Sequence, residues 1–250
     1  MRKKLFAANW KMNLGPKEGA QFCKDFLKLI SPDAQKEWVI FPSAITLTTV
    51  AENLKGSTVK FGGQNCYFED KGAFTGETSP AMFRECGASY ILVGHSERRQ
   101  IFGETDESCA KKIKLIIDNG LIPMLCVGET QEERDKDQTQ SVLERQLSKG
   151  LSLWNKSTPL TIAYEPVWAI GTGKVATPAM AEAVHVEIRK CLAKITGGPN
   201  RAAEIQILYG GSVKPDNSRE MIGLPNIDGF LVGGASMIPK SFAQIGQIPL

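Results

Sequence analysis

The feature that most constrains the fold is a regular alternation of short apolar runs with segments of helical periodicity along the whole chain. One helical segment carries Met180, Val184 and Ile188 at the spacing of an amphipathic helix. Such alternation is typical of parallel strands joined by right-handed crossover helices. The expected strands are Leu5–Trp10, Trp38–Phe41, Val59–Gly62, Tyr90–Val93, Ile122–Val127, Leu160–Tyr164, Ile205–Tyr209 and Gly229–Val232.

Eight strand–helix units in 250 residues fit a closed (β/α)8 barrel of the α/β class, with residues 1–250 as a single domain. An open, doubly wound parallel sheet is the alternative that the same pattern leaves open. No linker, low-complexity tract or charge block divides the chain. Several helices are expected to begin where an acceptor side chain precedes a good first-turn residue. These starts are Ser79-Pro80, Thr105-Asp106 and Thr177-Pro178.

Composition narrows the classes of partner and cofactor. The net charge of +3 is slight, so neither nucleic acid nor an acidic membrane surface is expected as a partner. The apolar run after the basic residues 1–4 is too short for a secretory signal, and no run is long enough to cross a bilayer. The six cysteines show no metal-ligand spacing, and two histidines cannot form a three-histidine zinc site. We therefore expect a cytoplasmic protein without a cofactor, although a metal held by carboxylates stays open.

Polar, titratable and glycine residues gather where the expected strands end. In a barrel, the carboxyl ends of the strands form the face that carries the chemistry. The sequence therefore predicts an active site built from these positions. They are Asn9 and Lys11, Gln64 and Asn65, His95 and Glu97, Cys126 and Glu129, Glu165, Gly210-Gly211-Ser212, and Gly233-Gly234.

The stretch from Thr161 to Ala176 combines a strand end with a glycine-containing loop. Pro166 restricts Glu165 to extended backbone angles, so the strand ends with a carboxyl group at the rim. The loop that follows contains two glycines and little charge, which suits a segment that changes shape over a site. This combination predicts a general base beneath a lid at about residues 166–176.

Two nucleotide-binding patterns in this stretch fail on context. Gly171-x-Gly173-x-x-Ala176 matches the dinucleotide fingerprint, but the expected strand ends too early and no acidic ribose partner follows at the right distance. A P-loop needs a glycine and a serine or threonine where this chain has Trp168 and Val175. Neither cofactor class is expected.

The glycine pairs after the last two strands suit a phosphate. Glycines let backbone N–H groups approach an anion, and a helix beginning near Ala235 would add its positive end. The alternative is that these glycines only turn the chain. His95 precedes a helix start, which should lower its pKa and keep it a neutral hydrogen-bond donor, or it is a structural rim histidine. His185 is expected on a partly exposed helix face without a functional role.

Lys11 lies just past a strand end. It could bind phosphate, stabilise an oxyanion or form a Schiff base, or it could be a solvated surface lysine. Glu97 could be catalytic or could form an ion pair with a nearby lysine, and we favour the supporting role. Arg98 and Arg99 are expected to be structural ion-pair donors and not ligands. Cys126 is expected to pack beside the base, because the sequence shows no cationic group to activate its thiol.

Longer motifs resemble the triosephosphate isomerase family, in the right order and over essentially the whole chain. Several such motifs together are far more specific than any one alone. They are Asn9-Trp10-Lys11-Met12-Asn13, Gln64-Asn65-Cys66, residues 72–77, residues 94–99, residues 126–130, residues 163–173 and Tyr209-Gly210-Gly211-Ser212-Val213.

The resemblance implies interconversion of dihydroxyacetone phosphate and D-glyceraldehyde 3-phosphate in glycolysis and gluconeogenesis, without a cofactor. It implies Glu165 as the base and neutral His95 as the group that polarises the carbonyl, a pairing for which this family is the known example. Lys11 would stabilise the enediolate and steer the substrate, and Asn9 would add a hydrogen bond. The phosphate would bind backbone N–H groups of Gly171, Ser212, Gly233 and Gly234 beneath the closed lid.

The resemblance also implies a homodimer. The loop at about residues 65–79 would reach the partner, where Thr75 would support Asn9 and Lys11 of the partner subunit. The chain departs from the family at Val175, where threonine or serine is common, and at Phe68, where tryptophan is frequent. We expect Val175 to alter lid kinetics at most, and Phe68 to change anchoring without changing the chemistry.

Two rival functions remain at the level of the sequence. One is another phosphate-binding barrel enzyme, such as an aldolase that forms a Schiff base on Lys11. The other is a phosphosugar-binding protein without catalytic activity. Trapping by borohydride separates the first from an isomerase, and the effect of replacing Glu165 separates the second.

Overall fold

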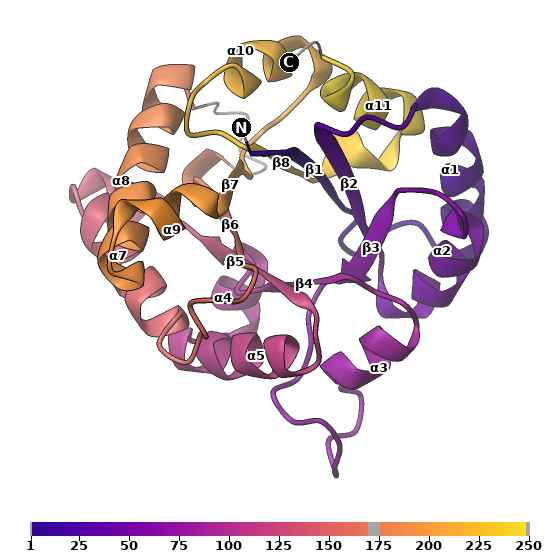
Figure 1. Cartoon of the computed structure of the whole chain (residues 1–250), viewed down its shortest axis with the longest axis horizontal. Helices are drawn as coiled ribbons and strands as arrows, with labels where there is room; N and C mark the ends of the chain where they lie inside the picture. The colour runs from indigo at the N-terminus through magenta and orange to yellow at the C-terminus, as the bar shows by residue number, and fades with distance from the viewer. Residues whose placement is uncertain (1, 170–175, 249–250) are drawn as a thin grey trace.

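Within residues 2–169 and 176–248, which the computed structural model describes, eight parallel strands close into a barrel in the order of the sequence. Figure 1 looks along this barrel and shows the helices arranged around it. The closed (β/α)8 barrel, or TIM barrel, is confirmed, and the open sheet is excluded. The strands are β1 (Lys4–Asn9), β2 (Lys36–Phe41), β3 (Lys60–Gly63), β4 (Tyr90–Val93), β5 (Ile122–Val127), β6 (Thr161–Tyr164), β7 (Gln206–Tyr209) and β8 (Gly229–Val232).

The helices cover the outside of the barrel and begin where the capping signals predict. Ser79, Thr105 and Thr177 each accept a hydrogen bond from a backbone N–H group of the first turn. The α-helices are α1 (Pro16–Leu29), α2 (Leu47–Leu54), α3 (Pro80–Glu85), α4 (Ser96–Phe102), α5 (Asp106–Asp118), α6 (Gln131–Asp135), α7 (Thr139–Gly150), α8 (Pro178–Thr196), α9 (Pro199–Glu204), α10 (Pro215–Ile222) and α11 (Pro239–Gly246). Short 3-10 helices are η1 (Ala44–Thr46), η2 (Val167–Ala169) and η3 (Gly234–Met237).

The core has two layers because successive strand residues point to opposite faces. In β1, Leu5 and Ala7 belong to the layer inside the barrel, whereas Phe6 and Ala8 belong to the layer between strands and helices. Burial on both faces explains why the strands read as continuous apolar runs. The barrel closes at Gly229, whose φ is 143° and where an added Cβ would overlap the carbonyl oxygen of Leu5. This arrangement holds the carboxyl ends of all eight strands at one face.

The structure corrects the expectation for His185. Its side chain is fully buried, not partly exposed, and its ring packs beside the rings of Tyr164 and Tyr209. Nδ1 lies 2.8 Å from the carbonyl oxygen of Ala181, one helical turn earlier. His185 is thus a core residue that joins α8 to the barrel.

The segment between β3 and α3 projects from the barrel, as Figure 1 shows at the bottom of the view. Within it, the rings of Tyr67 and Phe68 stack at 4.2 Å, and Phe74 lies 4.5 Å from Tyr67. Thr75 is exposed near its tip. The loop therefore has its own small aromatic cluster.

Two observations on the described ranges concern membrane spans and metal-binding clusters. None of these helices is both long and apolar enough to cross a membrane. The same ranges contain no cluster of three or more histidine, cysteine, aspartate or glutamate side chains that could hold a metal ion.

Candidate active site

A cavity of about 310 Å³ opens at the carboxyl ends of the strands and collects the residues singled out by the sequence. Asn9, Lys11, His95 and Glu165 line one side, and the loops after β7 and β8 line the other. The second group includes Ser212, Gly233 and Gly234. Gly171 and Val175 lie outside the described residues. Residues from most of the barrel thus meet at one point, as a closed barrel requires.

Glu165 follows β6 and is held at both its backbone and its carboxylate. Its N–H group donates to the carbonyl oxygen of Val127 at 2.8 Å, which continues the pairing of β5 with β6. Oε1 lies 2.9 Å from Nε2 of His95, and Oε2 accepts a 2.9 Å hydrogen bond from the Ser96 N–H group. Only 2% of the residue is exposed. Burial raises the pKa of this carboxyl, but His95 and the Ser96 N–H group lower it, and the net pKa lies below the ordinary value.

His95 ends β4 and caps α4 with its ring. Nδ1 accepts a 3.3 Å hydrogen bond from the Glu97 N–H group, so the proton of the neutral ring is on Nε2 and faces Glu165. Burial lowers the pKa of His95, whereas the Glu165 carboxylate raises it, and the net direction is upward. The expectation of a lowered pKa is therefore wrong for the ligand-free protein. The geometry nevertheless selects a neutral hydrogen-bond donor, because an imidazolium has no acceptor nitrogen.

Lys11 lies in the left-handed backbone region with φ of 53°, which is uncommon for a lysine. Its N–H group donates to Asn9 Oδ1 at 3.0 Å, and its carbonyl oxygen accepts from Gln64 Nε2 at 2.8 Å. These bonds hold the strained turn. The sequence placed Gln64 at a strand end without giving it a role, and the left-handed turn that it supports cannot be seen in a periodicity pattern.

The Lys11 side chain joins two parts of the site. Nζ lies 2.5 Å from Glu97 Oε1, so the predicted ion pair of Glu97 with a lysine is present. A Cβ added at Gly233 would lie 3.5 Å from Cε of Lys11, which shows how closely this side chain approaches the loop after β8. Lys11 therefore lies between the His95–Glu165 pair and the glycine loops.

The loop after β7 is held by close packing and by a helix start. A Cβ added at Gly211 would overlap the Tyr209 hydroxyl, so this close approach requires glycine. Asn217, in the first turn of α10, donates from Nδ2 to the carbonyl oxygen of Ser212 at 2.9 Å. Its Oδ1 accepts from the Lys214 N–H group at 2.8 Å. The backbone beside the cavity is thus fixed before any ligand binds.

Three further residues singled out by the sequence do not line this cavity: Cys126, Arg98 and Arg99. Cys126 is fully buried among the residues inside the barrel, and burial raises the pKa of its thiol, so it packs and is not a nucleophile. Arg98 and Arg99 pair with Glu104 and Asp106, at 2.7 and 2.6 Å, as structural donors.

Glu129 was grouped with the strand-end residues from the sequence, but without a role of its own. It is fully buried and accepts hydrogen bonds from the Tyr164 hydroxyl at 3.1 Å and from Trp168 Nε1 at 2.9 Å. Arg134 forms an ion pair with it at 3.0 Å, and the Val167 N–H group donates to its carbonyl oxygen. Glu129 therefore anchors the segment that directly follows Glu165. The signals in the sequence were its acidic side chain at a strand end and its place in the motif of residues 126–130.

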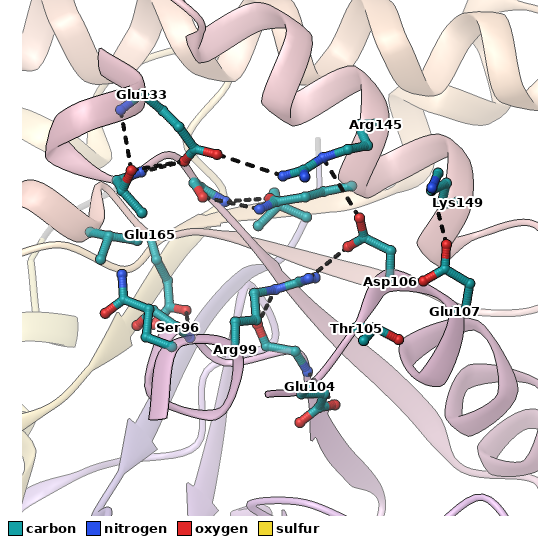
Figure 2. A pocket seen from close by; sticks show the side chains of 17 residues that line it. Ser96, Arg99, Glu104, Thr105, Asp106, Glu107, Glu133, Arg145, Lys149 and Glu165 are labelled. Carbon is teal, nitrogen blue, oxygen red and sulfur yellow. Dashed lines mark hydrogen bonds and ion pairs between the residues drawn. The ribbon is translucent and has the colours of Figure 1, made fainter. Parts of the chain in front are cut away.

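A second cavity, of about 360 Å³, lies behind Glu165. Figure 2 shows Glu165 and Ser96 at one end of it, with Arg99, Asp106 and Arg145 across the middle. Its cations already have carboxylate partners: Asp106 pairs with both arginines, and Lys149 with Glu107. Because these charges neutralise one another, this cavity suits an anionic ligand less well than the first.

The fold and this first cavity define a barrel enzyme equipped for acid–base chemistry on an anionic substrate: a buried carboxylate, an imidazole N–H group and a lysine face two glycine-rich loops. A family model described as triosephosphate isomerase matches residues 4–248. The chain belongs to the triosephosphate isomerase family.

Individual relatives agree with the family model. A protein of Bdellovibrio bacteriovorus named triosephosphate isomerase is 51% identical over 246 residues, which cover 98% of this chain and 100% of the relative. Proteins with the same name from Carboxydothermus hydrogenoformans and Aquifex aeolicus are 48% and 46% identical, over 98% and 97% of this chain and 98% of each relative. The similarity thus extends over the whole barrel.

Proposed function

We propose that this chain interconverts dihydroxyacetone phosphate and D-glyceraldehyde 3-phosphate through an enediolate intermediate, as an isomerase of glycolysis and gluconeogenesis that needs no cofactor. The observation that carries the proposal is the meeting of Glu165, His95 and Lys11 on one cavity beside two glycine-rich loops. Family membership and relatives named for this activity support it. A cytoplasmic location accords with this function.

The chemistry assigned to the site is a proton transfer between adjacent carbons. The Glu165 carboxylate takes a proton from the hydroxyl-bearing carbon next to the carbonyl group. The C–H electron pair forms the carbon–carbon double bond of the enediolate, and the π pair of the carbonyl group moves to its oxygen. Nε2–H of His95 hydrogen-bonds to this oxygen, and the Lys11 ammonium stabilises its negative charge. The proton of the adjacent hydroxyl group passes to the enediolate oxygen, a transfer for which the Nε2–H group of His95 is available, and the Glu165 carboxyl returns its own proton to the neighbouring carbon. Substrate binding must first separate Glu165 from His95, because the two are hydrogen-bonded in the ligand-free protein.

The phosphate is assigned to backbone N–H groups of Ser212, Gly233 and Gly234, with Gly171 joining from the loop that follows Glu165. A lid at about residues 166–176 would close over the substrate and exclude water. Asn9 holds the Lys11 backbone through its hydrogen bond to the Lys11 N–H group, and it would also contact the substrate. Cys126 and Glu97 act in support of Glu165 and Lys11.

The proposal is tested with glyceraldehyde 3-phosphate in an assay linked to reduction of dihydroxyacetone phosphate. Glu165→Gln should lower kcat by several orders of magnitude, because no group remains to take the proton, while inorganic phosphate still binds. Glu165→Asp keeps the charge but withdraws the carboxylate, so kcat should fall by a smaller factor. Unchanged turnover in Glu165→Gln contradicts the proposal. Trapping of substrate on Lys11 by borohydride identifies the rival aldolase, and phosphate binding without any turnover identifies a binding protein.

We also propose that the chain acts as a homodimer through the loop at residues 65–79. A small cavity of about 190 Å³ lies on the far side of Asn9 and Lys11, away from the glycine loops. Met12, which is 95% exposed, and Phe102, 67% exposed, line its rim. Two strongly exposed apolar side chains at the rim of one cavity would suit contact with a second copy of the chain. A partner's loop in this cavity would bring Thr75 of the partner subunit against Asn9 and Lys11.

A further inference from the structure

Two lysines, Lys11 and Lys214, line the catalytic cavity, and they differ in whether the ammonium group has an ion-pair partner among the described residues. Lys11 is paired with Glu97 at 2.5 Å. Lys214 is exposed, and its ammonium group makes no ion pair or hydrogen bond with any residue in the described ranges. Lys214 therefore offers an uncompensated positive charge beside the loops assigned to the phosphate.

The backbone of Lys214 is fixed, although its ammonium group has no partner among the described residues. The Lys214 N–H group donates to Asn217 Oδ1 at 2.8 Å, and Asn217 also bonds the carbonyl oxygen of Ser212. Pro215 begins α10 directly afterwards. The side chain is thus attached to a rigid point two residues from Ser212, and only its own rotatable bonds decide where the charge lies.

Lys214 stands at the boundary between the cavity and solvent. Together with Gly234 and Ala235, it lines both the catalytic cavity and a shallow groove outside it. Asp216 and Ile238 line the outer groove but not the catalytic cavity. A phosphate that approaches the backbone N–H groups of Gly234 from this side comes within reach of the Lys214 ammonium before it enters.

The charges of the ligand-free cavity make this position important. Glu165 is an anion in the cavity wall, and Glu97 neutralises the other lysine. A dianionic phosphate thus meets one uncompensated negative charge inside, and the only unpaired cation in the described lining is Lys214. Cations at the mouth of a cleft raise association rates of anions by about 10- to 1000-fold in total, and single exposed charges contribute a part of that.

We propose that Lys214 is a positioning residue that captures the substrate phosphate at the mouth and directs it to the loops after β7 and β8, with Asp216 opposing this attraction. This inference rests on the proposed function and deepens it, because it assigns the step before the chemistry. Lys214 makes no contact with the reacting carbons. Its effect is on capture and orientation, and it depends on ionic strength.

The test compares Lys214→Gln and Lys214→Glu with Lys240→Gln, which removes an exposed lysine that lines neither the cavity nor the groove. At low salt, kcat/KM of Lys214→Gln should fall about three- to tenfold, mainly through KM, and the loss should shrink as salt is added. Lys214→Glu should lose more, and Asp216→Asn should gain modestly. The inhibition constant of inorganic phosphate should rise in Lys214→Gln, rise further in Lys214→Glu and fall modestly in Asp216→Asn. With glyceraldehyde, which lacks a phosphate, Lys214→Gln and the unmodified protein should have equal kcat/KM.

Two results overturn the proposal. One is an equal dependence of kcat/KM on ionic strength in Lys214→Gln and Lys240→Gln. The other is a loss in Lys214→Gln that falls on kcat, or that appears equally with glyceraldehyde, since either marks a structural role. If the unmodified protein shows no isomerase activity, the proposed function fails separately. Calorimetric titration with inorganic phosphate then still decides whether Lys214 captures the anion, since Lys214→Gln must bind it more weakly than Lys240→Gln.

Discussion

Nε2 of His95 lies 2.9 Å from Oε1 of Glu165, so the proposed base and the proposed donor to the carbonyl oxygen are hydrogen-bonded to each other in the ligand-free protein. The contact stabilises the Glu165 carboxylate and keeps the His95 proton on the nitrogen that faces the cavity. It also links the titration of each residue to the charge of the other.

This link predicts the direction in which the His95 pKa changes when Glu165 is replaced. The carboxylate raises the pKa of His95 above 6.5 against the opposing effect of burial. In Glu165→Gln an uncharged amide replaces the carboxylate that raises the pKa of His95 most. Burial then has the larger effect, and the pKa of His95 should fall below that of the unmodified protein. The measurement is a proton NMR titration of the imidazole carbons. It is simple to interpret because the chain has two histidines and the other, His185, has a pKa of about 4.

A matched control comes from Glu97. Its carboxylate also raises the pKa of His95, but by less than that of Glu165. Glu97→Gln should therefore move the titration in the same direction by a smaller amount. An unchanged His95 titration in Glu165→Gln would falsify the contact as the cause of the raised pKa.

Most of the fold was predictable because every strand of the barrel is buried on both faces. Such strands appear in the sequence as apolar runs bounded by polar residues, and the eight predicted runs lie within two residues of the observed strands. The polar residues after them had to meet, since a closed barrel brings all strand ends to one rim. Hence the amino-acid sequence alone was enough to group Lys11, His95 and Glu165.

The burial of individual side chains and the strain of the backbone were harder to predict from the sequence. His185 lies next to the apolar stripe of α8, and a periodicity pattern cannot tell whether a residue at the edge of a stripe faces solvent or a neighbouring ring. The left-handed turn at Lys11 depends on Gln64, which is distant in sequence. Both features arise from contacts between elements, which local sequence does not encode.

The burial of His185 predicts a specific dependence of stability on pH. Desolvation lowers its pKa to about 4 in the folded chain, whereas an unfolded histidine titrates near 6.5. Between these values only the unfolded chain binds the proton, so stability falls as the pH drops from 6.5 towards 4. The loss attributable to His185 between pH 7 and pH 5 should be about 2 kcal/mol.

The acid groups around His185 make the comparison between variants essential. Asp228 and Glu182 act on its charge and also titrate as the pH falls. Urea unfolding at pH 7 and pH 5 should therefore be compared for the unmodified protein and His185→Gln. The difference between the two pH values should be smaller in the variant by the amount given above. An identical difference in both proteins would show that His185 does not carry the effect.

Gly128 predicts how strongly catalysis depends on the position of the Glu165 backbone. A Cβ at residue 128 would overlap the carbonyl oxygen of Glu165, so Gly128→Ala must displace the base or distort β5. A shift of about 1 Å in a reacting group costs about 100-fold in rate. We expect kcat to fall by at least this factor, while inhibition by inorganic phosphate changes little. Gly15→Ala is the control, since an added Cβ there meets nothing within 4 Å and φ is −64°; similar kcat values for both variants would argue against this reasoning.

The projecting loop predicts that assembly and activity depend on one another. Thr75 is exposed in the single chain, and Phe74 remains 40% exposed although it packs on Tyr67. If this loop docks on a partner, an arginine at residue 75 has to be buried in a small cavity against Lys11 of the partner subunit, and like charges there repel. Thr75→Arg should then be monomeric by light scattering at micromolar concentration, where we expect the unmodified protein to be a dimer.

The same variant separates a loss of assembly from a loss of the site. Its kcat should fall by at least about tenfold, because Asn9 and Lys11 lose the proposed contact with Thr75 of the partner subunit. Dilution of the unmodified protein should lower its specific activity towards the same value. Ser152→Arg introduces the same charge at an exposed position after α7 and should leave mass and activity unchanged. A fully active monomer of Thr75→Arg would contradict the role of the partner's loop, because the site would then be complete within one chain.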